Sequence, residues 1–251
     1  MRRTRSRLRT ETRQLMQQIF TKLDYRALAP IYCDEGGEAF WEDRRGPCER
    51  LGLAIAAALK DRLSSRGRSL YVGAGVAELP PLIMEVLDRQ REVMAFNLRA
   101  QEVAILNAAC HDLPLSFRAA DARSAPGTFD HIWLVSVLND PECFPMLSAL
   151  SYGRANPVTF DVEAFSQERT MVFDLVAGCL QKLSCPGLIT TSIEEIPWIT
   201  DWCDRHAAAY VIDDAIYPTA LVGDPLCFVW IHGSARPETE PARRAPIRAS
   251  S

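Results

Sequence analysis

The chain has 251 residues, of which 48% are hydrophobic and 24% charged, and its formal net charge is −4. This apolar share is enough for a substantial core, which excludes global disorder, and no apolar run approaches the roughly 20 residues of a membrane-spanning helix. Because an acidic protein offers few clustered cations for phosphate contacts, nucleic acid is disfavoured as a partner.

The cysteines and the basic N-terminus bear on location. Eight cysteines are scattered along the chain without a CxxC pair, a pattern typical of reduced thiols rather than of a disulfide scaffold. No apolar segment follows the Arg-rich start as a secretory signal would require. We therefore expect a cytoplasmic location, with a mitochondrial transit peptide as the alternative. The excess of Arg over Lys is typical of a G+C-rich, bacterial genome, and a homodimer is compatible with the sequence.

The N-terminal part predicts helices. Apolar side chains recur every four positions over 14–29, and a second helix is expected over 47–63 with Pro47 at its start. Between them, the Gly-containing polar segment 34–46 is expected to form a loop that exposes Phe40 and Trp41.

From residue 67 onward, strand patterns alternate with helix patterns. Strands are expected at 69–72, 92–96, 115–120, 129–138, 187–193, 210–215 and 227–232. The helices expected between them are 78–89, 100–109, 167–182 and 197–208. This alternation predicts a doubly wound α/β sheet, and the short link before the final strand predicts an antiparallel pair at the end. The segment 139–163 contains three Pro and is expected to be irregular.

A Gly-rich turn follows the first of these strands. The segment YVGAGVAE, residues 71–78, contains Gly73 and Gly75, and such glycines let the chain turn sharply and let a ligand approach the backbone. The dinucleotide fingerprint needs a small residue where this chain has Glu78, and the small residue falls at Ala77 instead. The spacing therefore disfavours NAD and fits another nucleoside cofactor.

At these landmarks the sequence resembles the class I S-adenosylmethionine (SAM)-dependent methyltransferases over roughly residues 68–234. YVGAG is similar to the family's Gly-rich first motif, EVMAFN to the strand whose tip meets the ribose, and RAADAR to the turn beside the adenine. FDHIWLVSVLND is similar to the fourth-strand motif that leads into the active site. The resemblance implies a mostly parallel seven-stranded sheet with an antiparallel last strand, preceded here by an N-terminal helical extension.

The resemblance also implies which residues bind SAM. The Gly-rich turn would face the methionine part, the second strand's tip the ribose, the next turn the adenine, and the fourth strand's end the sulfonium. In that order the residues are Tyr71, Gly73, Gly75 and Ala77, then Asn97 and Leu98, then Asp121 and Ala122, and finally Val135 and Ser136.

Two of these positions depart from the family pattern. Tyr71 stands where the first motif begins with Asp or Glu, and Asn97 stands where the ribose ligand is a carboxylate. An Asn can accept one hydrogen bond and donate another, but it cannot form the charge-assisted pair, which is about twice as strong as a neutral one. These departures motivate an alternative, a methyltransferase-like subunit that binds a partner without catalysis.

Candidates for the acceptor site lie beyond the fourth strand and in the N-terminal part. Asp140, in the segment NDPE, is the candidate general base or substrate anchor, and its alternative role is a helix cap before Pro141. NDPE differs from the motif of amino-group methylases, which disfavours base methylation. No metal is predicted, because Cys203 and His206 are only two ligands on one helical face. The candidate substrate-binding residues are Phe40, Trp41, Asn139, Tyr152 and Arg154.

The sequence therefore predicts a SAM-dependent methyltransferase that acts on a small-molecule acceptor. The alternatives are the catalytically silent binding or partner subunit and a transferase of the aminocarboxypropyl or aminopropyl group of SAM. A nicotinamide-dependent oxidoreductase is disfavoured by Glu78. The expected parts are 1–66, an arm and helical cap; 67–234, a SAM-binding methyltransferase-like domain; and 235–251, a disordered tail.

Overall fold

The computed structural model describes residues 7–33, 39–221 and 224–234 and contains one seven-stranded sheet in the order β3-β2-β1-β4-β5-β7-β6. The last strand, β7, runs antiparallel to both neighbours, and the other pairs are parallel. This confirms the predicted sheet. The strands are β1 Arg68–Val72, β2 Glu92–Asn97, β3 Phe117–Ala119, β4 Phe129–Leu134, β5 Leu183–Ser192, β6 Ala208–Ile212 and β7 Leu226–Ser234.

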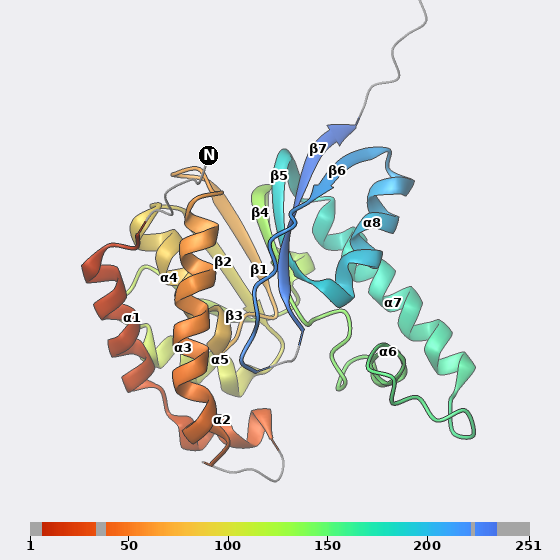
Figure 1. The fold of residues 1–251 in the computed structure, drawn as a ribbon, viewed down its shortest axis with the longest axis horizontal. Coiled ribbons are helices and arrows are strands. Elements are labelled where there is room, and N and C mark those ends of the chain that lie inside the picture. Colours follow the sequence, from red (N-terminus) through yellow and green to blue (C-terminus); the bar gives the residue numbers. More distant parts are fainter. Residues whose placement is uncertain (1–6, 34–38, 222–223, 235–251) are drawn as a thin grey trace, which may run out of the picture.

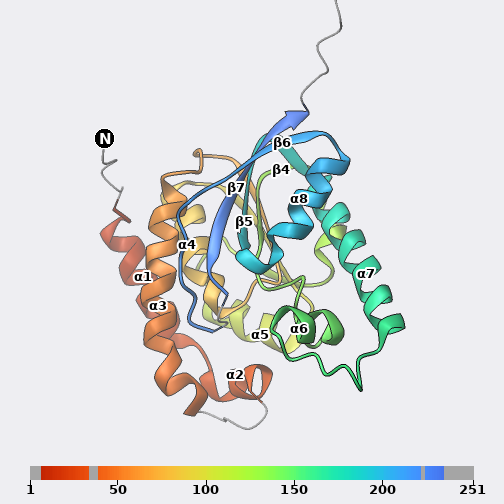
Figure 2. The ribbon, with the colours of Figure 1, turned by 45° about the vertical axis from the view of Figure 1, so that its right-hand side comes forward.

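Helices cover both faces of the sheet, as a doubly wound fold requires (Figures 1 and 2). One face carries α4 and α5, with α1 and α3 packed outside them, and the other carries α7 and α8. The helices are α1 Thr10–Lys22, α2 Tyr25–Tyr32, α3 Ala39–Lys60, α4 Leu79–Asp88, α5 Ala100–Ala109, α6 Pro145–Ser151, α7 Val162–Leu180 and α8 Ile196–Arg205. Three short 3₁₀ turns are η1 Val76–Glu78, η2 Ala122–Ser124 and η3 Ile193–Glu195.

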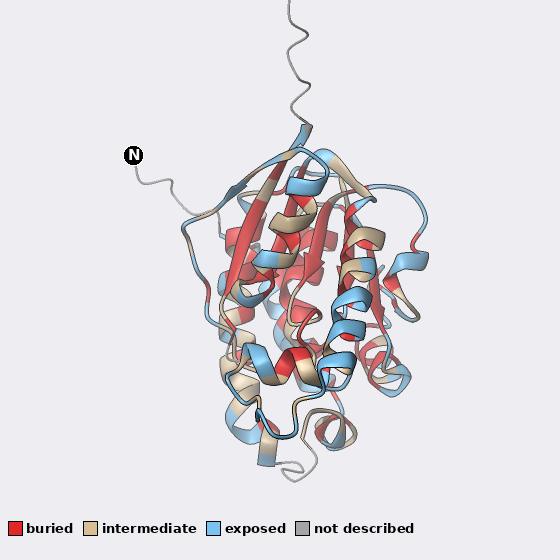
Figure 3. Cartoon of the chain, turned by 90° about the vertical axis from the view of Figure 1, so that its right-hand side faces the viewer, coloured by how far each residue is buried: buried red, intermediate tan, exposed pale blue. Residues whose placement is uncertain are grey.

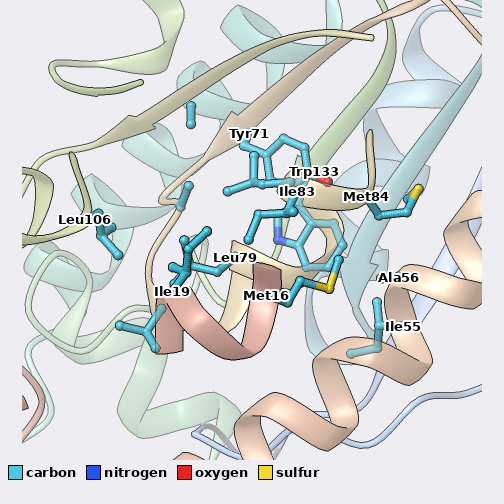
Figure 4. Close-up of a cluster of buried hydrophobic side chains, with 14 of the residues drawn as sticks. Met16, Ile19, Ile55, Ala56, Tyr71, Leu79, Ile83, Met84, Leu106 and Trp133 are labelled. Carbon is cyan, nitrogen blue, oxygen red and sulfur yellow. The ribbon is translucent and has the colours of Figure 1, made fainter. Parts of the chain in front are cut away.

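Two apolar clusters form because successive side chains of a strand point to opposite faces. In β1 and β4, Leu70 and Ile132 join the cluster under α7 and α8, whereas Tyr71 and Trp133 join the cluster under α1, α3 and α4. The central strands β1 and β4 are accordingly buried on both faces (Figure 3). Figure 4 shows how α1, α3 and α4 contribute to the second cluster through Met16, Ile19, Ile55, Ala56, Leu79, Ile83 and Met84.

The helix expected over 14–29 is two helices, α1 and α2. The carboxylate of Asp24 accepts the Ala27 N–H at 3.0 Å and so starts α2 as an N-cap. Pro30 lies inside α2 rather than at its end. Helical periodicity alone does not distinguish one helix from two that share an apolar face, so the prediction missed the break.

The loop expected over 34–46 is helical from residue 39, and 34–38 lie outside the described residues. Pro47 is therefore inside α3 rather than at its start. Trp41, expected to be exposed, is only 2% exposed. Its ring lies 5.3 Å from that of Tyr25 and 5.0 Å from that of Tyr32. This packing against two rings of α2 favours a buried Trp41 over one exposed in a loop.

Two further segments differ from expectation. The strand expected over 129–138 ends at Leu134, and the segment 139–163 contains α6 and the first two residues of α7. Asp161 starts α7 by accepting two backbone N–H groups, at 2.9 and 3.0 Å. The expected tail, 235–251, lies outside the described residues. The boundary at 66/67 stays a prediction. Over the described part of the chain, no helix is both long and apolar enough to cross a membrane.

Candidate functional site

A cavity of about 650 Å³ lies at the carboxyl ends of the parallel strands. Its position follows from the topology, because β1 and β4 are the neighbours at which the strand order reverses and a crevice opens. The volume falls in the range of small-molecule sites, about 300–1,000 Å³. The wall comes from the Gly-rich turn, the segments after β2, β3 and β4, helices α2, α3 and α7, and the link between β6 and β7.

The Gly-rich turn lies on the cavity wall and requires both of its glycines. Gly73 has a φ of +70°, and a Cβ there would come within 2.7 Å of the Val137 side chain. The Gly75 N–H donates to Glu78 at 2.8 Å. Burial raises the pKa of Glu78 to about 7, so this carboxyl is half protonated near neutral pH. Glu78, which disfavoured the dinucleotide fingerprint, therefore stabilises the Gly-rich turn by accepting this hydrogen bond.

The tip of β2 carries a carboxylate that comes from α5. The Asn97 amide donates to the Ala74 carbonyl at 2.9 Å and to the Glu102 carboxylate at 3.0 Å. The Tyr32 hydroxyl of α2 donates to the other carboxylate oxygen of Glu102 and accepts the Val76 N–H at 3.2 Å. Burial raises the pKa of Glu102, which lines the cavity.

Sequence reasoning missed Glu102. The signal was available, because an acid in the first turn of the helix that follows a strand tip lies close to that tip. Sequence reasoning also missed Tyr32, which is 70 positions away from Glu102 along the chain.

The turn after β3 holds the residues predicted to face the adenine. The Asp121 carboxylate accepts the Arg123 N–H at 2.8 Å and pairs with its guanidinium at 2.6 Å, which lowers the pKa of Asp121. Ala122 is buried. Leu98, which follows β2 and also lines the cavity, is 68% exposed, so its apolar side chain is accessible to a ligand.

The segment after β4 is held by Glu195. Its buried carboxylate accepts the N–H groups of Ser136, Val137 and Leu138 at 3.0, 2.6 and 2.7 Å. These bonds hold the segment after β4 against η3, which directly follows β5. Ser136 adopts a φ of +54°, which costs on the order of 1 kcal/mol, and its buried Oγ has no partner among the described residues. The signal for Glu195 was the capping-box spacing from Ser192.

The predicted acceptor residues divide into two groups. Phe40, Asn139, Asp140 and Tyr152 line the cavity. The carboxylate of Asp140 contacts Arg99 at 3.2 Å; it also accepts the Glu142 N–H at 2.8 Å, as expected of a cap.

Trp41, Arg154 and Tyr71 do not line the cavity. The Tyr71 ring is fully buried, its hydroxyl donates to Glu85 at 2.7 Å, and only the backbone around it resembles the family motif. Of the other residues predicted to bind the cofactor, Gly73, Gly75, Ala77, Asn97, Leu98, Asp121, Ala122, Val135 and Ser136 all line this cavity. Within the described ranges, no three His, Cys, Asp or Glu side chains are grouped so that they could hold a metal ion.

Comparison with known proteins bears on the fold. No protein-family model matches the chain, and no curated protein matches it. Among solved structures it is similar to magnesium protoporphyrin IX methyltransferase (ChlM) from Synechocystis PCC 6803 with bound SAM, at 10% identity and a TM-score of 0.51, over 91% of this chain and 100% of that one.

It is also similar to N-methyltransferase NodS from Bradyrhizobium japonicum WM9 in complex with S-adenosyl-L-homocysteine, at 12% identity and a TM-score of 0.47, over 86% of this chain and 98% of that one. Precorrin-6y C5,15-methyltransferase from Geobacter metallireducens GS-15 gives 11% identity and a TM-score of 0.44, over 71% of this chain and 87% of that one. The sheet order and the likeness to ChlM show that this chain has the class I SAM-dependent methyltransferase fold.

Proposed function

We propose that the chain is a SAM-dependent methyltransferase with a small-molecule acceptor. The observation that carries the proposal is the Glu102 carboxylate at the tip of β2, held by the Asn97 amide and the Tyr32 hydroxyl on the wall of the cavity. A carboxylate in that place can accept charge-assisted hydrogen bonds from a ribose diol. Glu102 supplies the negative charge that Asn97 lacks, which weighs against the alternative of a catalytically silent subunit that no longer binds SAM.

The rest of the wall suits the other parts of SAM. The bare Leu98 side chain and the buried Ala122 offer apolar contact to an adenine. Gly73 and Gly75 lie on the cavity wall without side chains, so the methionine part can approach their backbone closely. Bound SAM would supply an electrophilic methyl group on its sulfonium.

The chain's own contribution is positioning. Methyl transfer in line with an acceptor depends mainly on holding the two reacting atoms in place, and a rigid site contributes most to that. Glu195 fixes the segment after β4 by three backbone hydrogen bonds. Asp140, paired with Arg99, serves as an anchor for the acceptor.

The shape and charge of the cavity support a small acceptor. Helices α2 and α3 contribute Tyr32, Phe40 and Ile55 to one side, and Phe144 and Tyr152 lie on the wall formed by the chain after β4. Such an apolar enclosure suits a small molecule. A nucleic acid would need clustered cations, whereas Arg99 and Arg123 are paired with carboxylates.

The test is calorimetric titration of the full chain with SAM, with NAD as the ligand control. Gly75→Asp should abolish SAM binding, because its Cβ would lie 2.6 Å from Glu102 and 2.7 Å from the Tyr32 hydroxyl. Gly233→Asp is the matched variant, since the nearest atom to a Cβ there is 3.5 Å away, on Cys185 and outside the cavity.

We expect wild type and Gly233→Asp to bind SAM with micromolar affinity. A folded wild-type protein that does not bind SAM would overturn the proposal, as would a Gly75→Asp variant that binds normally. Product analysis then identifies the group transferred. S-adenosylhomocysteine marks methyl transfer, and methylthioadenosine marks an aminocarboxypropyl or aminopropyl transferase.

A further inference from the structure

Three polar side chains from distant segments meet at the β4 side of the cavity. Asn139 follows β4, Tyr152 follows α6, and Asp224 precedes β7. The Asn139 amide nitrogen lies 2.9 Å from the Tyr152 hydroxyl and 3.1 Å from the Asp224 carboxylate, and the hydroxyl lies 2.5 Å from the same carboxylate. We call these residues the 139–152–224 triad.

The triad leaves one hydrogen-bond acceptor unused. A carboxylate only accepts, so the amide must turn its NH₂ group toward Asp224, and the Tyr152 hydroxyl must donate to it as well. The amide oxygen Oδ1 of Asn139 is then the group left over, and it is buried with no partner among the described residues. Asn139 is 3% exposed and belongs to the cavity wall. An unpaired buried acceptor is unfavourable, so an occupant that donates a hydrogen bond to it is favoured.

The charge around the triad is negative. Asp224 is 4% exposed, and none of the ion pairs found between described residues includes it. The pKa of the Tyr152 hydroxyl is raised by burial, by its hydrogen bond to Asp224 and by the charges of Glu195 and Glu194. Negative charge in a buried wall favours a ligand group that is positive or becomes positive.

The cations near this wall are already paired. Arg99 contacts Asp140 and Glu142, at 3.2 and 3.0 Å, and Arg123 contacts Asp121 at 2.6 Å. Arg154 lies over the Tyr152 ring at 5.0 Å and does not line the cavity. A carboxylate or phosphate acceptor would therefore meet acidic groups without a free cation among the described lining residues.

The triad lies far from the adenine end of the proposed SAM site. β3, which precedes the proposed adenine side, is three strand spacings from β4, or roughly 14 Å at about 4.8 Å each. The wall of the same cavity also includes the apolar side chains of Phe144, Met171 and Leu226. A compact molecule with an apolar body and one donor group fits there.

We propose that the methyl acceptor is an amine, bound through an N–H group to the Asn139 amide oxygen; this inference rests on the proposed function. The amine reacts in its neutral form, after releasing a proton to solvent where it binds as an ammonium ion; its nitrogen lone pair then forms the new N–C bond while the S–C bond breaks and its electrons stay on sulfur. The nitrogen thereby gains positive charge, which Asp224 stabilises, and its extra proton then leaves to solvent. An alcohol acceptor would need a base at the reacting oxygen, but the Asp140 carboxylate is paired with Arg99, and the Asp224 carboxylate accepts hydrogen bonds from Asn139 and Tyr152.

The first part of the test compares matched ligands. Two sets share an apolar body: phenethylamine, 2-phenylethanol and phenylacetate; and tryptamine, tryptophol and indole-3-acetate. Binding to the full chain is followed by ligand-observed NMR, with and without S-adenosylhomocysteine. We expect at least one amine to bind about tenfold or more tightly than its alcohol and carboxylate, the scale of one charge-assisted hydrogen bond. If the amine binds no more tightly than its alcohol and carboxylate in both sets, the inference is overturned.

The second part uses variants. Asp224→Asn keeps the shape and removes the charge, and Asn139→Ala removes the unpaired oxygen; each should weaken amine binding about tenfold. Glu92→Gln removes the same charge from an exposed ion pair with Arg68 at the other end of the strands and should leave amine binding unchanged. Thermal melting identifies variants that fail to fold.

Unchanged amine binding in a folded Asp224→Asn protein would overturn the inference. SAM binding without an amine preference would overturn this inference and leave the proposed function. An amine preference in a protein that does not bind SAM would overturn the proposed function, and with it the role of the amine as methyl acceptor, and would leave only an amine-binding site.

Discussion

The two ends of the parallel strands treat buried polar groups in opposite ways. At the amino ends, the fully buried Glu85 contacts Arg91 at 2.9 Å and His131 at 2.9 Å, and Arg91 also contacts Asp130 at 2.5 Å. At the carboxyl ends, Ser136 Oγ and Asn139 Oδ1 are buried and have no partner among the residues that the structure describes. We call the amino ends the compensated end, because the buried charges there are paired, and the carboxyl ends the uncompensated end, because these two buried polar atoms are not.

The difference has a physical reason. Burying a charge costs several kcal/mol unless it is paired and hydrogen-bonded. A buried ionic cluster that binds no ligand must therefore find all of its ion-pair and hydrogen-bond partners within the protein. Polar groups at a binding site must instead keep some capacity for the ligand. The amino end thus serves stability and the carboxyl end serves binding, and substitutions at the two ends should have separable effects.

The largest effect should come from the compensated end. Glu85→Ala removes the buried carboxylate that contacts Arg91 and His131, leaves Arg91 with Asp130 alone, and should lower the free energy of unfolding by about 3–5 kcal/mol. Chemical denaturation measures the change. Glu92→Ala is the control, because its ion pair with Arg68 is exposed and should contribute about 0–1 kcal/mol. Equal losses in the two variants would contradict the contrast between buried and exposed pairs.

Glu78 should make stability depend on pH. Its pKa is raised from 4.5 to about 7, so the folded state holds a proton that the unfolded state has already released. The carboxyl therefore favours folding below about pH 4.5, and this contribution is lost as the pH rises to about 7, by up to about 3 kcal/mol.

Glu78→Gln removes this titration and can still accept the Gly75 N–H. The variant should gain stability relative to wild type between pH 5 and pH 8, measured by denaturation at both values. A difference between the two proteins that stays constant with pH would show that Glu78 does not titrate in this range.

A smaller effect is expected from Glu102, and it should appear in binding. Glu102→Gln replaces the carboxylate at the tip of β2 with a neutral amide, and the affinity for SAM should fall about tenfold to a hundredfold, the equivalent of about 1.5–3 kcal/mol. Calorimetry measures the affinity. Glu163→Gln, an exposed acid in the first turn of α7, is the control. An unchanged affinity would mean that Glu102 is structural, like Glu85.

The smallest effect is expected from a polar group at the carboxyl end that is already paired. Asp161→Ala leaves two N–H groups at the start of α7 without their acceptor and should lower the free energy of unfolding by about 1 kcal/mol. Asp161→Asn keeps a capping oxygen and should restore most of that loss. If both variants were equally destabilised, the carboxylate would matter as a charge rather than as a cap.

How far the sequence predicted this structure depended on the range of each interaction. Strand and helix periodicity, the Gly73–Gly75 turn and the antiparallel last strand were all predicted, because each follows from neighbouring residues. The break at Asp24 and the helical start of α3 were missed, because an N-cap and aromatic packing outweighed the local pattern. Tyr71 matched a motif by position, yet its side chain lies in the core.

The sequence by itself determined the order of elements and the backbone turns of the site, since both depend on residues a few positions apart. Only the tertiary structure decided which side chains complete the site. Tyr32 reaches Glu102 across 70 positions and Asn139 reaches Asp224 across 85. Such contacts exist only after the helices pack on the sheet and the link before β7 returns to the cavity, because packing of the whole chain, and not local pattern, brings them within hydrogen-bond distance.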